Sequence, residues 1–561
     1  MNDTFTWLLL SDFTIDPLAD CLRKSKNPCM PCMIGPIDQV RQVIHQADHE
    51  CWRSIPQGAV VWTQPFKAVP AFSKLYYEGA TDLEAVYEEV RDYARSLKCL
   101  ATKVSLLIVP VWTLPAHLAG DGVADYRNRT GIRNVLGRMN LLLAEELEAY
   151  ENVFLLSTEK WLIRSVSSAN EALWYLGKIP FSREVFVQAA EDIIASVQAF
   201  YGTTRKVLVL DLDNTLWGGV IGEDGIDGIL LGGPDPAGEA YQDFQRHLLA
   251  LKNNGTLLGI VSKNEEGNAF EAIERHPDMV LRRKDFSSWR INWEDKARNI
   301  IHMAEELNLG VDSFVFIDDN PVERDRIRKA LPAVFVPDWP EDPIYYSRAL
   351  SELKCFSGSA RSGEDRERTR YYREEADRRK ALEELTSIED WLDSLQLRLT
   401  VEEVGRSNIV RAVQLLNKTN QFNLLTRRMG QTEFAEFIGG EGRRAFLFRL
   451  NDRLGDYGSI GLATIELKEE ALGVMDFLLS CRAMGRGVEQ GMLYVLAQFA
   501  GMIGRQKMTA CYVPTPKNKP CASFLPVHGF EEQVRSVWTV SCEDIRKPAY
   551  IEIISPIMID H

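Results

Sequence analysis

Short runs of apolar residues alternate with longer stretches of helical character over the first 200 residues of the chain. The apolar runs, each the length of a buried strand, cover residues 7–10, 59–62, 104–109 and 153–156. Helical character is clearest over residues 83–97 and 141–150. Strands and helices in alternation predict a layered α/β domain over residues 1–200.

The middle of the chain, residues 204–355, repeats this alternation with shorter and more uniformly apolar strands. The expected strands cover residues 206–210, 257–261 and 314–317, and the expected helices cover 238–252 and 295–307. Continuous apolar runs are typical of parallel strands buried on both faces. Parallel strands joined by helices predict a doubly wound, Rossmann-like fold.

A segment dense in Glu, Arg and Asp separates this region from the last one. We interpret residues 356–397 as a charged helical linker, with a capping box at Thr386 and Glu389 opening a new helix. Beyond it, residues 398–561 contain expected strands at 444–450, 459–466 and 473–479, and a long helix begins near Gly485. This order predicts a third, α+β domain.

Composition narrows the functional classes. A chain of 561 residues with 45% hydrophobic residues is long enough for three domains of about 100–200 residues. The net charge of -15 disfavours nucleic-acid binding, which needs a basic face. Apolar runs fall short of the roughly 20 residues of a membrane span. The N-terminus lacks the basic flank of a signal peptide. Together with 10 cysteines in no disulfide-like framework, this predicts a cytoplasmic protein with reduced thiols.

Two aspartates follow the strand at 206–210, in the sequence Asp211-Leu-Asp213-Asn-Thr215. In an open α/β sheet, ligands bind at the carboxyl ends of the strands. Alternate residues of a strand face the same side, so both carboxylates can point into one crevice. One can attack phosphorus, and the other can protonate the leaving oxygen.

Two carboxylates facing a phosphate require a cation, and hard oxygen ligands favour Mg²⁺. A further acidic ligand, Asp318, stands at the end of the strand at 314–317, with Asp319 beside it. Lys296 offers charge balance, and Ser262 offers a hydroxyl donor at the end of the strand between them.

In their order and strand context, these elements resemble the haloacid-dehalogenase superfamily. The resemblance implies that Asp211 is the nucleophile and Asp213 the acid/base, with Ser262 and Lys296 as phosphate donors. It implies metal ligands at Asp211, Asp213 (through its carbonyl) and Asp318, and Asp319 is not ranked firmly below Asp318. The spacing leaves room for a Gly-rich flap at 218–233 and for no cap domain, so the site is expected to admit a large substrate.

In the third region, Arg482-x-x-Gly485-x-Gly487 after a strand resembles the pyrophosphate loop of the Gcn5-related acyltransferases. Cys481 precedes the loop, where a helix N-terminus and Arg482 would depress its pKa, making it a candidate acyl carrier. Cys521, in the helix entering the same cleft, is the rival thiol.

A run dense in carboxamides, which includes Asn417 and Asn420, is expected to form a turn that caps backbone or holds a polar ligand. Basic residues nearby can meet an acidic carrier protein or its phosphopantetheine phosphate. The candidate residues for binding substrate or phosphopantetheine are therefore Thr215, Asn417, Asn420, Arg482, Gly485 and Gly487.

Five motifs together resemble the FkbH-like family: Asp211-Leu-Asp-Asn-Thr-Leu-Trp-Gly-Gly, Trp289-Arg-Ile-Asn-Trp293, Phe316-Ile-Asp-Asp-Asn-Pro-Val-Glu, Asn417-Lys-Thr-Asn-Gln and Ser480-Cys-Arg-Ala-Met-Gly-Arg. This resemblance implies an enzyme that dephosphorylates 1,3-bisphosphoglycerate and loads the glyceryl group as a thioester on an acyl carrier protein for polyketide-type biosynthesis. The carrier is expected to be a separate protein.

Two other readings of function stay open. A plain phosphatase needs only residues 204–355, and a non-catalytic scaffold would keep the folds and bind carrier protein. Residues 1–200 faintly resemble an SGNH-hydrolase scaffold but lack the Asp-x-x-His of those enzymes after the strand at 153–156. We therefore expect a docking domain there.

Overall fold

The computed structural model describes the chain from residue 6 to residue 555 with ten internal gaps. The described ranges are 6–25, 28–79, 82–115, 122–165, 167–169, 171–356, 388–453, 455–480, 483–515, 518–534 and 536–555. The chain divides into two compact units, Met1–Tyr201 with Arg428–Phe437, and Gly202–Arg427 with Ile438–His561. Within the described ranges, every helix is too short or too polar to cross a membrane.

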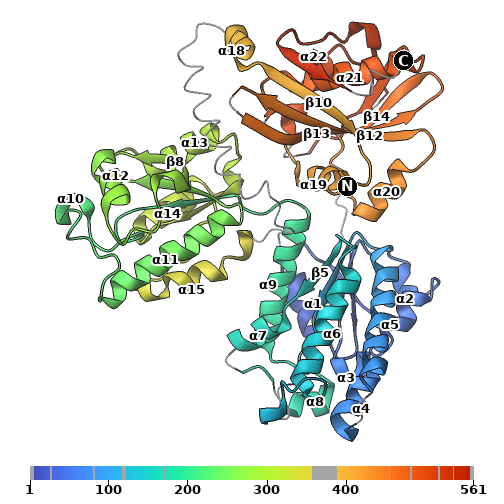
Figure 1. Ribbon diagram of the computed structural model, residues 1–561, viewed down its shortest axis with the longest axis vertical. Helices are drawn as coiled ribbons and strands as arrows, with labels where there is room; N and C mark the ends of the chain where they lie inside the picture. Colours follow the sequence, from blue (N-terminus) through green and yellow to red (C-terminus); the bar gives the residue numbers. More distant parts are fainter. Residues whose placement is uncertain are drawn as a thin grey trace. The chain divides into compact units, whose positions relative to one another are not determined.

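The first unit, which contains the blue part of the ribbon in Figure 1, is built on a five-stranded parallel sheet. The strand order is β2-β1-β3-β4-β5. Its strands are β1 (Trp7–Ser11), β2 (Cys32–Ile34), β3 (Gly58–Trp62), β4 (Leu106–Pro110) and β5 (Val153–Leu156). Side chains alternate between the two faces, so Leu8 and Leu10 enter one core while Trp7 and Leu9 enter the other. The α/β class expected for this region is therefore observed.

Helices cover both faces of this sheet. One face carries α2 (Val40–His45), α4 (Pro70–Glu78), α5 (Leu83–Ala101) and α6 (Ile132–Leu147). The other carries α1 (Asp16–Arg23), α7 (Thr158–Arg164) and α9 (Arg183–Phe200). Two short helices, α3 (Pro65–Ala68) and α8 (Glu171–Gly177), complete this part of the chain. The doubly wound order is shared by many enzymes and binding proteins, so the SGNH-like assignment stays a prediction.

A four-stranded parallel sheet, in the order β8-β7-β6-β9, forms the core of the middle region. Its strands are β6 (Val207–Leu210), β7 (Leu257–Ser262), β8 (Phe286–Ile291) and β9 (Phe314–Ile317). Three of them match the expected strands. The fourth, β8, was not foreseen, because two serines and an arginine interrupt its apolar pattern.

Two helical layers cover this sheet. The first contains α11 (Pro236–Asn253), α12 (Glu266–Arg275) and α15 (Tyr346–Glu352), and the second contains α13 (Lys296–Glu306) and α14 (Pro321–Ala330). The strand connections hold only these helices and a small flap, so residues 202–356, all of them described, contain no inserted cap domain. The flap closes where Gly218 and Leu230 exchange backbone hydrogen bonds of 2.9 and 2.8 Å, and it encloses α10 (Ile221–Asp224).

The last region forms a nine-stranded mixed sheet in the order β16-β17-β15-β14-β13-β12-β10-β18, with β11 also pairing with β14. Its strands are β10 (Leu397–Glu403), β11 (Phe422–Asn423), β12 (Arg443–Asp452), β13 (Gly455–Leu467), β14 (Ala471–Leu479), β15 (Lys507–Cys511), β16 (Glu531–Val534), β17 (Val537–Ser541) and β18 (Ile551–Ile554). Its helices are α18 (Ile388–Leu395), α19 (Ile409–Lys418), α21 (Val488–Met502) and α22 (Phe524–Val527). Helix α20 (Gln431–Ile438) falls in this stretch of sequence, but up to Phe437 it belongs to the first compact unit.

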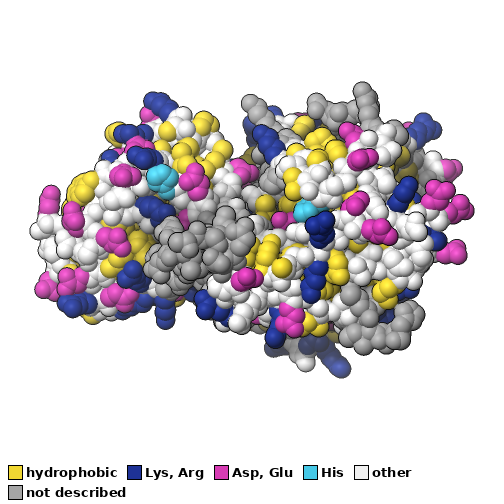
Figure 2. Space-filling view, turned by 90° about the horizontal axis from the view of Figure 1, so that it is seen from above, with side chains coloured by type: hydrophobic (Ala, Val, Ile, Leu, Met, Phe, Trp, Pro, Cys, Tyr) yellow, Lys and Arg dark blue, Asp and Glu magenta, His cyan; other side chains and the backbone are white. Residues whose placement is uncertain are grey.

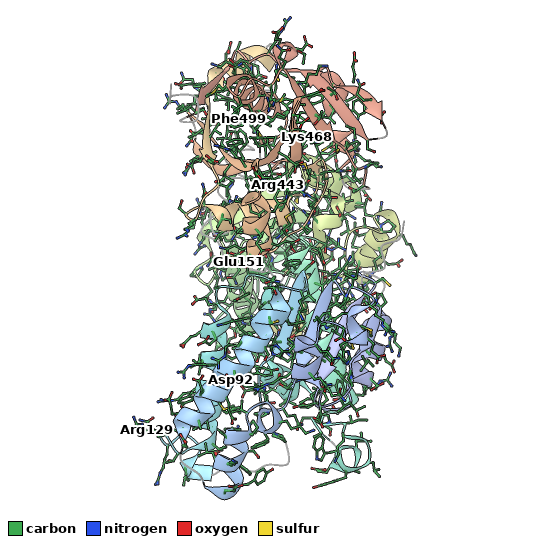
Figure 3. All side chains as sticks on the ribbon, turned by 90° about the vertical axis from the view of Figure 1, so that its right-hand side faces the viewer. Asp92, Arg129, Glu151, Arg443, Lys468 and Phe499 are labelled. Atoms are coloured by element: carbon green, nitrogen blue, oxygen red, sulfur yellow. The ribbon has the colours of Figure 1, made fainter. Side chains whose placement is uncertain are left out.

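Helix α21 connects β14 to β15, which pair in parallel inside an otherwise largely antiparallel sheet. Phe499 on this helix (Figure 3) packs edge-on against Phe446 of β12, with ring centroids 5.2 Å apart. The expected α+β character is therefore present. Residues 357–387, most of the proposed charged linker, lie outside the described residues.

Surface charge and thiol state agree with the composition. On the face drawn in Figure 2, basic side chains are interspersed with acidic ones. Nine cysteines lie in the described residues, and all nine are free thiols.

Candidate active site

Strand register brings the predicted phosphoryl-handling residues to one edge of the middle sheet. Leu210 of β6 pairs with Ile317 of β9 on one side and with Ile260 of β7 on the other. Asp211 and Asp318 come directly after the first pair, so parallel strands place them side by side at their carboxyl ends. Asp211 donates its backbone N–H to the Ile317 carbonyl at 3.0 Å, which extends the ladder to this residue.

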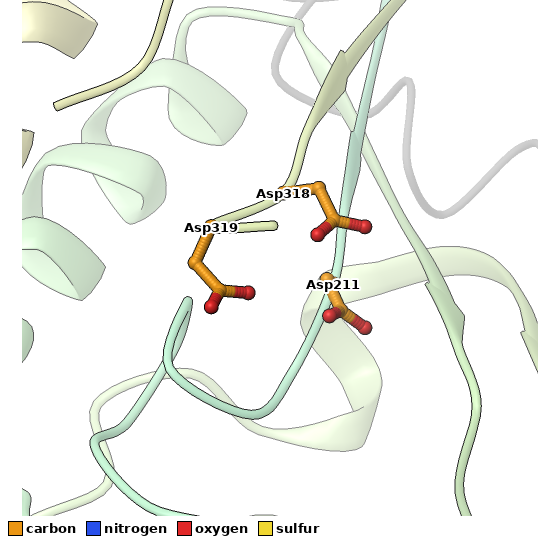
Figure 4. Close-up of side chains that lie close together, drawn as sticks. All are labelled: Asp211, Asp318 and Asp319. Carbon is orange, nitrogen blue, oxygen red and sulfur yellow. The ribbon is translucent and has the colours of Figure 1, made fainter. Parts of the chain in front are cut away.

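Three carboxylates gather at this edge (Figure 4). Asp211, Asp318 and Asp319 each offer an oxygen, and these oxygens lie within 4.8 Å of one another. Asp318 is fully buried, Asp211 nearly so, and Asp319 half-buried. Asp319 therefore lies in one cluster with Asp211 and Asp318, the two side chains predicted from the sequence as metal ligands.

Lys296 is the first residue of α13, and Asp295 caps that helix by accepting from the Arg298 N–H at 3.1 Å. The Lys296 ammonium lies 3.1 Å from Asp211 Oδ2 and 2.7 Å from Asp318 Oδ2. Burial disfavours its charge, but these two carboxylates outweigh burial and raise the pKa of Lys296 above its ordinary value. Burial and the Asp211 charge raise the pKa of Asp318 to about 6, with Lys296 opposing them.

The second oxygen of Asp211 is buried and unbonded. Its Oδ1 has no hydrogen-bond partner among the described residues, although Oδ2 lies beside Lys296. A buried carboxylate oxygen without a partner costs free energy unless a cation or other electrophile compensates it. Together with Asp318 and Asp319, the site offers the all-oxygen donor set that hard divalent cations take.

Asp213 is held apart from this cluster. Its Oδ1 accepts from Trp217 Nε1 at 3.0 Å and from the Ile221 N–H at 3.1 Å, while its Oδ2 accepts from Asn264 Nδ2 at 2.8 Å. Burial raises the pKa of Asp213, with those three donors opposing it. A fixed carboxyl group with a raised pKa suits proton transfer. Asn264 therefore helps to position the Asp213 carboxyl group.

Thr215 is fully buried, and its hydroxyl accepts from the Asp319 N–H at 3.2 Å. The structure thus gives this predicted binding residue a contact that joins the two aspartate loops. Arg324 fixes the same loop, because its guanidinium donates to the carbonyls of Asp318 and Asp319, both at 2.6 Å. Arg324 was not predicted, since a single arginine in a helix carries no distinguishing pattern.

Ser262, the predicted phosphate donor, is the last residue of β7 and is 2% exposed. Its carbonyl accepts from the Asn292 N–H at 3.1 Å, which joins the ends of β7 and β8. The next residue, Lys263, forms an ion pair of 2.6 Å with Glu323 on α14. The connections after β7, β8 and β9 are thereby linked at the edge that carries the aspartates.

The two predicted residues that open the acyltransferase-like loop, Cys481 and Arg482, lie outside the described residues. The glycines that follow have left-handed backbones, with φ of 78° at Gly485 and 65° at Gly487. A side chain at Gly487 would collide with the Tyr550 hydroxyl, so only glycine fits there.

The rival thiol, Cys521, is fully buried in the hydrophobic core of the last region. Burial raises its pKa to about 12. A thiol with this pKa is almost entirely protonated at neutral pH, and nucleophilic attack requires the thiolate. The described structure therefore gives Cys521 the character of a core residue.

The carboxamide run lies at the end of α19. Asn420 Nδ2 donates to the Gly202 carbonyl at 2.9 Å, and Asn417 is almost fully buried. Asn423 caps the following turn, accepting from the Thr426 N–H at 2.8 Å. For Asn420 and Asn423, the contacts are the backbone-capping ones that sequence analysis offered beside ligand binding.

A parallel sheet with aspartates after two neighbouring strands, a buried lysine at the start of the helix before β9 and a small flap form the arrangement that the haloacid-dehalogenase resemblance implies. The comparison with solved structures agrees. The N-terminal part of the protein BF1531 from Bacteroides fragilis, which contains a phosphatase domain complexed with Mg, matches 64% of this chain and 94% of its own, at 28% identity and a TM-score of 0.58.

Two acetyltransferases match a smaller part of the chain. The ribosomal-protein-S18-alanine N-acetyltransferase from Escherichia coli covers 26% of this chain and 94% of its own, at 11% identity and a TM-score of 0.21. The spermidine N-acetyltransferase from Vibrio cholerae, solved with CoA and spermine, covers 26% and 97%, at 13% identity and 0.21. Scores this low carry no argument about function. No protein-family model and no curated protein matches the chain.

Proposed function

We propose that this chain is a Mg²⁺-dependent enzyme that dephosphorylates 1,3-bisphosphoglycerate and loads the glyceryl group, as a thioester, on a separate phosphopantetheinylated acyl carrier protein. The observation that carries the phosphoryl half is the unbonded Oδ1 of Asp211 inside a cluster with Asp318 and Asp319. The glyceryl and carrier half rests on the FkbH-like motifs.

The donor set fits magnesium, and the similar BF1531 domain was solved with Mg. Asp211, Asp318 and Asp319 would hold the ion, with the Asp213 carbonyl as the further ligand that the superfamily resemblance implies. When bound, Mg²⁺ neutralises charge on the phosphate and on the carboxylates that face it.

The proposed phosphoryl step gives a separate role to each of the two aspartates. An Asp211 carboxylate oxygen attacks phosphorus, and the bond from phosphorus to the glyceryl oxygen breaks with its electron pair on that oxygen. Protonated Asp213 gives its proton to this leaving oxygen. Asp213 then takes a proton from water, which attacks the aspartyl phosphate, releases inorganic phosphate and regenerates Asp211.

The acyl step needs a thiolate near the acyl phosphate. Attack on the carbonyl carbon forms a carbon–sulfur bond and breaks the carbon–oxygen bond to phosphate, which leaves as the second inorganic phosphate. Cys481 is the proposed first acceptor, because burial makes Cys521 a poor nucleophile. Exchange with the carrier thiol then transfers the acyl group. Thioester exchange is nearly isoenergetic, so the acyl phosphate supplies the driving force.

A plain phosphatase is the second candidate. The aspartate site and the similarity to the BF1531 phosphatase domain support the phosphoryl step, and that step needs no thiol. A non-catalytic scaffold is the less favoured alternative. Asp211 and Lys296 are both buried, which is costly for charged side chains, and a scaffold would not require them.

Intact-mass spectrometry separates these functions. The purified chain is incubated with 1,3-bisphosphoglycerate, Mg²⁺ and phosphopantetheinylated carrier, with Asp211→Asn and Cys481→Ala beside the wild type. A glyceryl adduct on the carrier, lost in both variants, supports the proposal. An adduct that still forms with Cys481→Ala would mean that another thiol carries the acyl group, or that no covalent intermediate forms on the enzyme. Phosphate release without any adduct supports the phosphatase.

A further inference from the structure

One arginine supports the loop that carries Asp318 and Asp319. Arg324, on α14, is 9% exposed, and its Nη1 donates to the carbonyl oxygens of both aspartates, at 2.6 Å each. Backbone carbonyls inside a protein need a donor, and here a single guanidinium nitrogen supplies two consecutive ones. The contact therefore fixes the backbone of the two residues whose carboxylates form a cluster with Asp211 (Figure 4).

Two further hydrogen bonds hold this loop, and both use neutral groups. The Asp319 N–H donates to the Thr215 hydroxyl at 3.2 Å, and the Asn320 N–H donates to Asp318 Oδ1 at 2.9 Å. The side chain of aspartate is short and adopts few rotamers, so its carboxylate moves with its backbone. Groups that fix the backbone of this loop therefore also fix the metal-ligand oxygens that it carries.

Electrostatics oppose an arginine in this position. Lys296 already places one buried positive charge beside Asp211 and Asp318. Burial and the Asp211 charge raise the pKa of Asp319, and the positive charges of Lys296 and Arg324 oppose this rise. The field of Arg324 thus reaches the carboxylate cluster, where a second cation repels a divalent metal ion.

Arg324 also differs from the other charged groups at this edge of the sheet. Those groups are paired with one another or exposed: Lys263 with Glu323, Arg326 with Asp295, and Arg298 in the first turn of α13 exposed. The guanidinium of Arg324 is instead buried against the backbone of the aspartate loop. Its contribution to the site is therefore geometric, and its charge works against the metal.

We propose that Arg324 is a positioning residue that sets the affinity of the site for Mg²⁺ by fixing the backbone of Asp318 and Asp319. The proposal rests on the magnesium site of the proposed function. Geometry and charge predict opposite signs when a neutral residue replaces Arg324. Loss of the positive charge by itself strengthens Mg²⁺ binding, whereas loss of the two hydrogen bonds weakens it, and supporting groups of this kind are worth about 10–100-fold in metal affinity.

Isothermal titration calorimetry of the full chain with MgCl₂ measures the Kd for the wild type, Arg324→Gln, Arg324→Lys and Arg328→Gln. Glutamine removes the charge, and lysine keeps both the charge and a donor. Arg328, one turn further along α14, is the matched control. It also donates to two backbone carbonyls, those of Val336 and Pro337, at 3.1 and 3.0 Å. These two residues lie outside the aspartate cluster.

We expect Arg324→Gln to raise the Kd for Mg²⁺ by about 10–100-fold, Arg324→Lys to raise it less, and Arg328→Gln to change it by less than about twofold. A lower or unchanged Kd in Arg324→Gln, or an equal rise in Arg328→Gln, overturns the proposal. Should circular dichroism show that Arg324→Gln does not fold, Arg324→Lys decides: a rise beyond about twofold supports the proposal, and a smaller one overturns it. A wild-type chain that binds no Mg²⁺ overturns the metal site together with this proposal, so the two failures are distinguishable.

Discussion

Replacing Lys296 by methionine removes the cation shared by two buried carboxylates. The side chain is 4% exposed, and its partners Asp211 and Asp318 are 11% and 0% exposed. Methionine keeps the length of the aliphatic chain, so the lost charge dominates the effect. Breaking a buried ion pair by removing one partner costs about 3–5 kcal/mol, because a charge stays buried without compensation.

For a domain of this size, about 2–4 °C of Tm is lost per kcal/mol, so we expect Lys296→Met to lower the Tm of this domain by about 6–20 °C in chelator. The loss is greater at pH 8 than at pH 5. The folded-state pKa of Asp318, about 6, lies above its ordinary value, so the folded state binds more protons and stability falls as pH rises. Removing Lys296 raises that pKa further.

Differential scanning fluorimetry with chelator and with Mg²⁺ measures this effect. A divalent cation replaces part of the missing charge, so Mg²⁺ raises the Tm of the variant more than that of the wild type. The matched control is Lys263→Met, whose partner Glu323 also lies at this edge but whose side chain is 38% exposed. It should cost no more than about 1 kcal/mol. Equal melting of both variants, with no extra response to Mg²⁺, would refute the reasoning.

Three further predictions follow from other groups. Asp213→Asn should slow phosphate release from an alkyl phosphate by about 10²–10⁴-fold, but release from p-nitrophenyl phosphate far less, because nitrophenolate leaves without a proton. Burial raises the pKa of Asp12 to about 7, so the free energy of unfolding of the first unit should fall by roughly 2–3 kcal/mol from pH 5 to pH 8. Urea titrations at the two pH values measure this difference, and Asp12→Asn should lose most of it. Maleimide labelling followed by peptide mass spectrometry should modify exposed Cys29 at least about tenfold faster than buried Cys521; equal rates would contradict the core assignment.

The sheet and the aspartates were predictable because their signals are local. Strands β6 and β9 are uninterrupted apolar runs, and an aspartate follows each, so the hydrophobic pattern places Asp211 and Asp318 at the carboxyl ends of their strands. That the two strands are neighbours is known only from the sheet order. The helices around them begin at residues that accept a backbone N–H, such as Asp295 and Asn320.

The parts that sequence analysis missed depend on distant contacts. Arg324 supports the Asp318–Asp319 loop through two backbone carbonyls, a role that leaves no pattern in the chain. Among the described strands, β8 pairs only with β7, and an edge strand tolerates the serines and arginine that interrupt its apolar pattern. Sequence analysis left the choice between Cys481 and Cys521 open, because the burial of a thiol cannot be read from sequence; Cys521 is buried in the structure, which disfavours it as a nucleophile.

The same contacts explain how an open site keeps its geometry without a cap. A capped site can use closure of a second domain to complete its set of groups. Here the connections after the strands are joined directly, by Thr215 to Asp319, by Asn264 to Asp213 and by Lys263 to Glu323. The aspartates of this site are therefore held in place by the protein's own contacts before any ligand binds. Preorganisation of this kind favours rate without requiring domain motion.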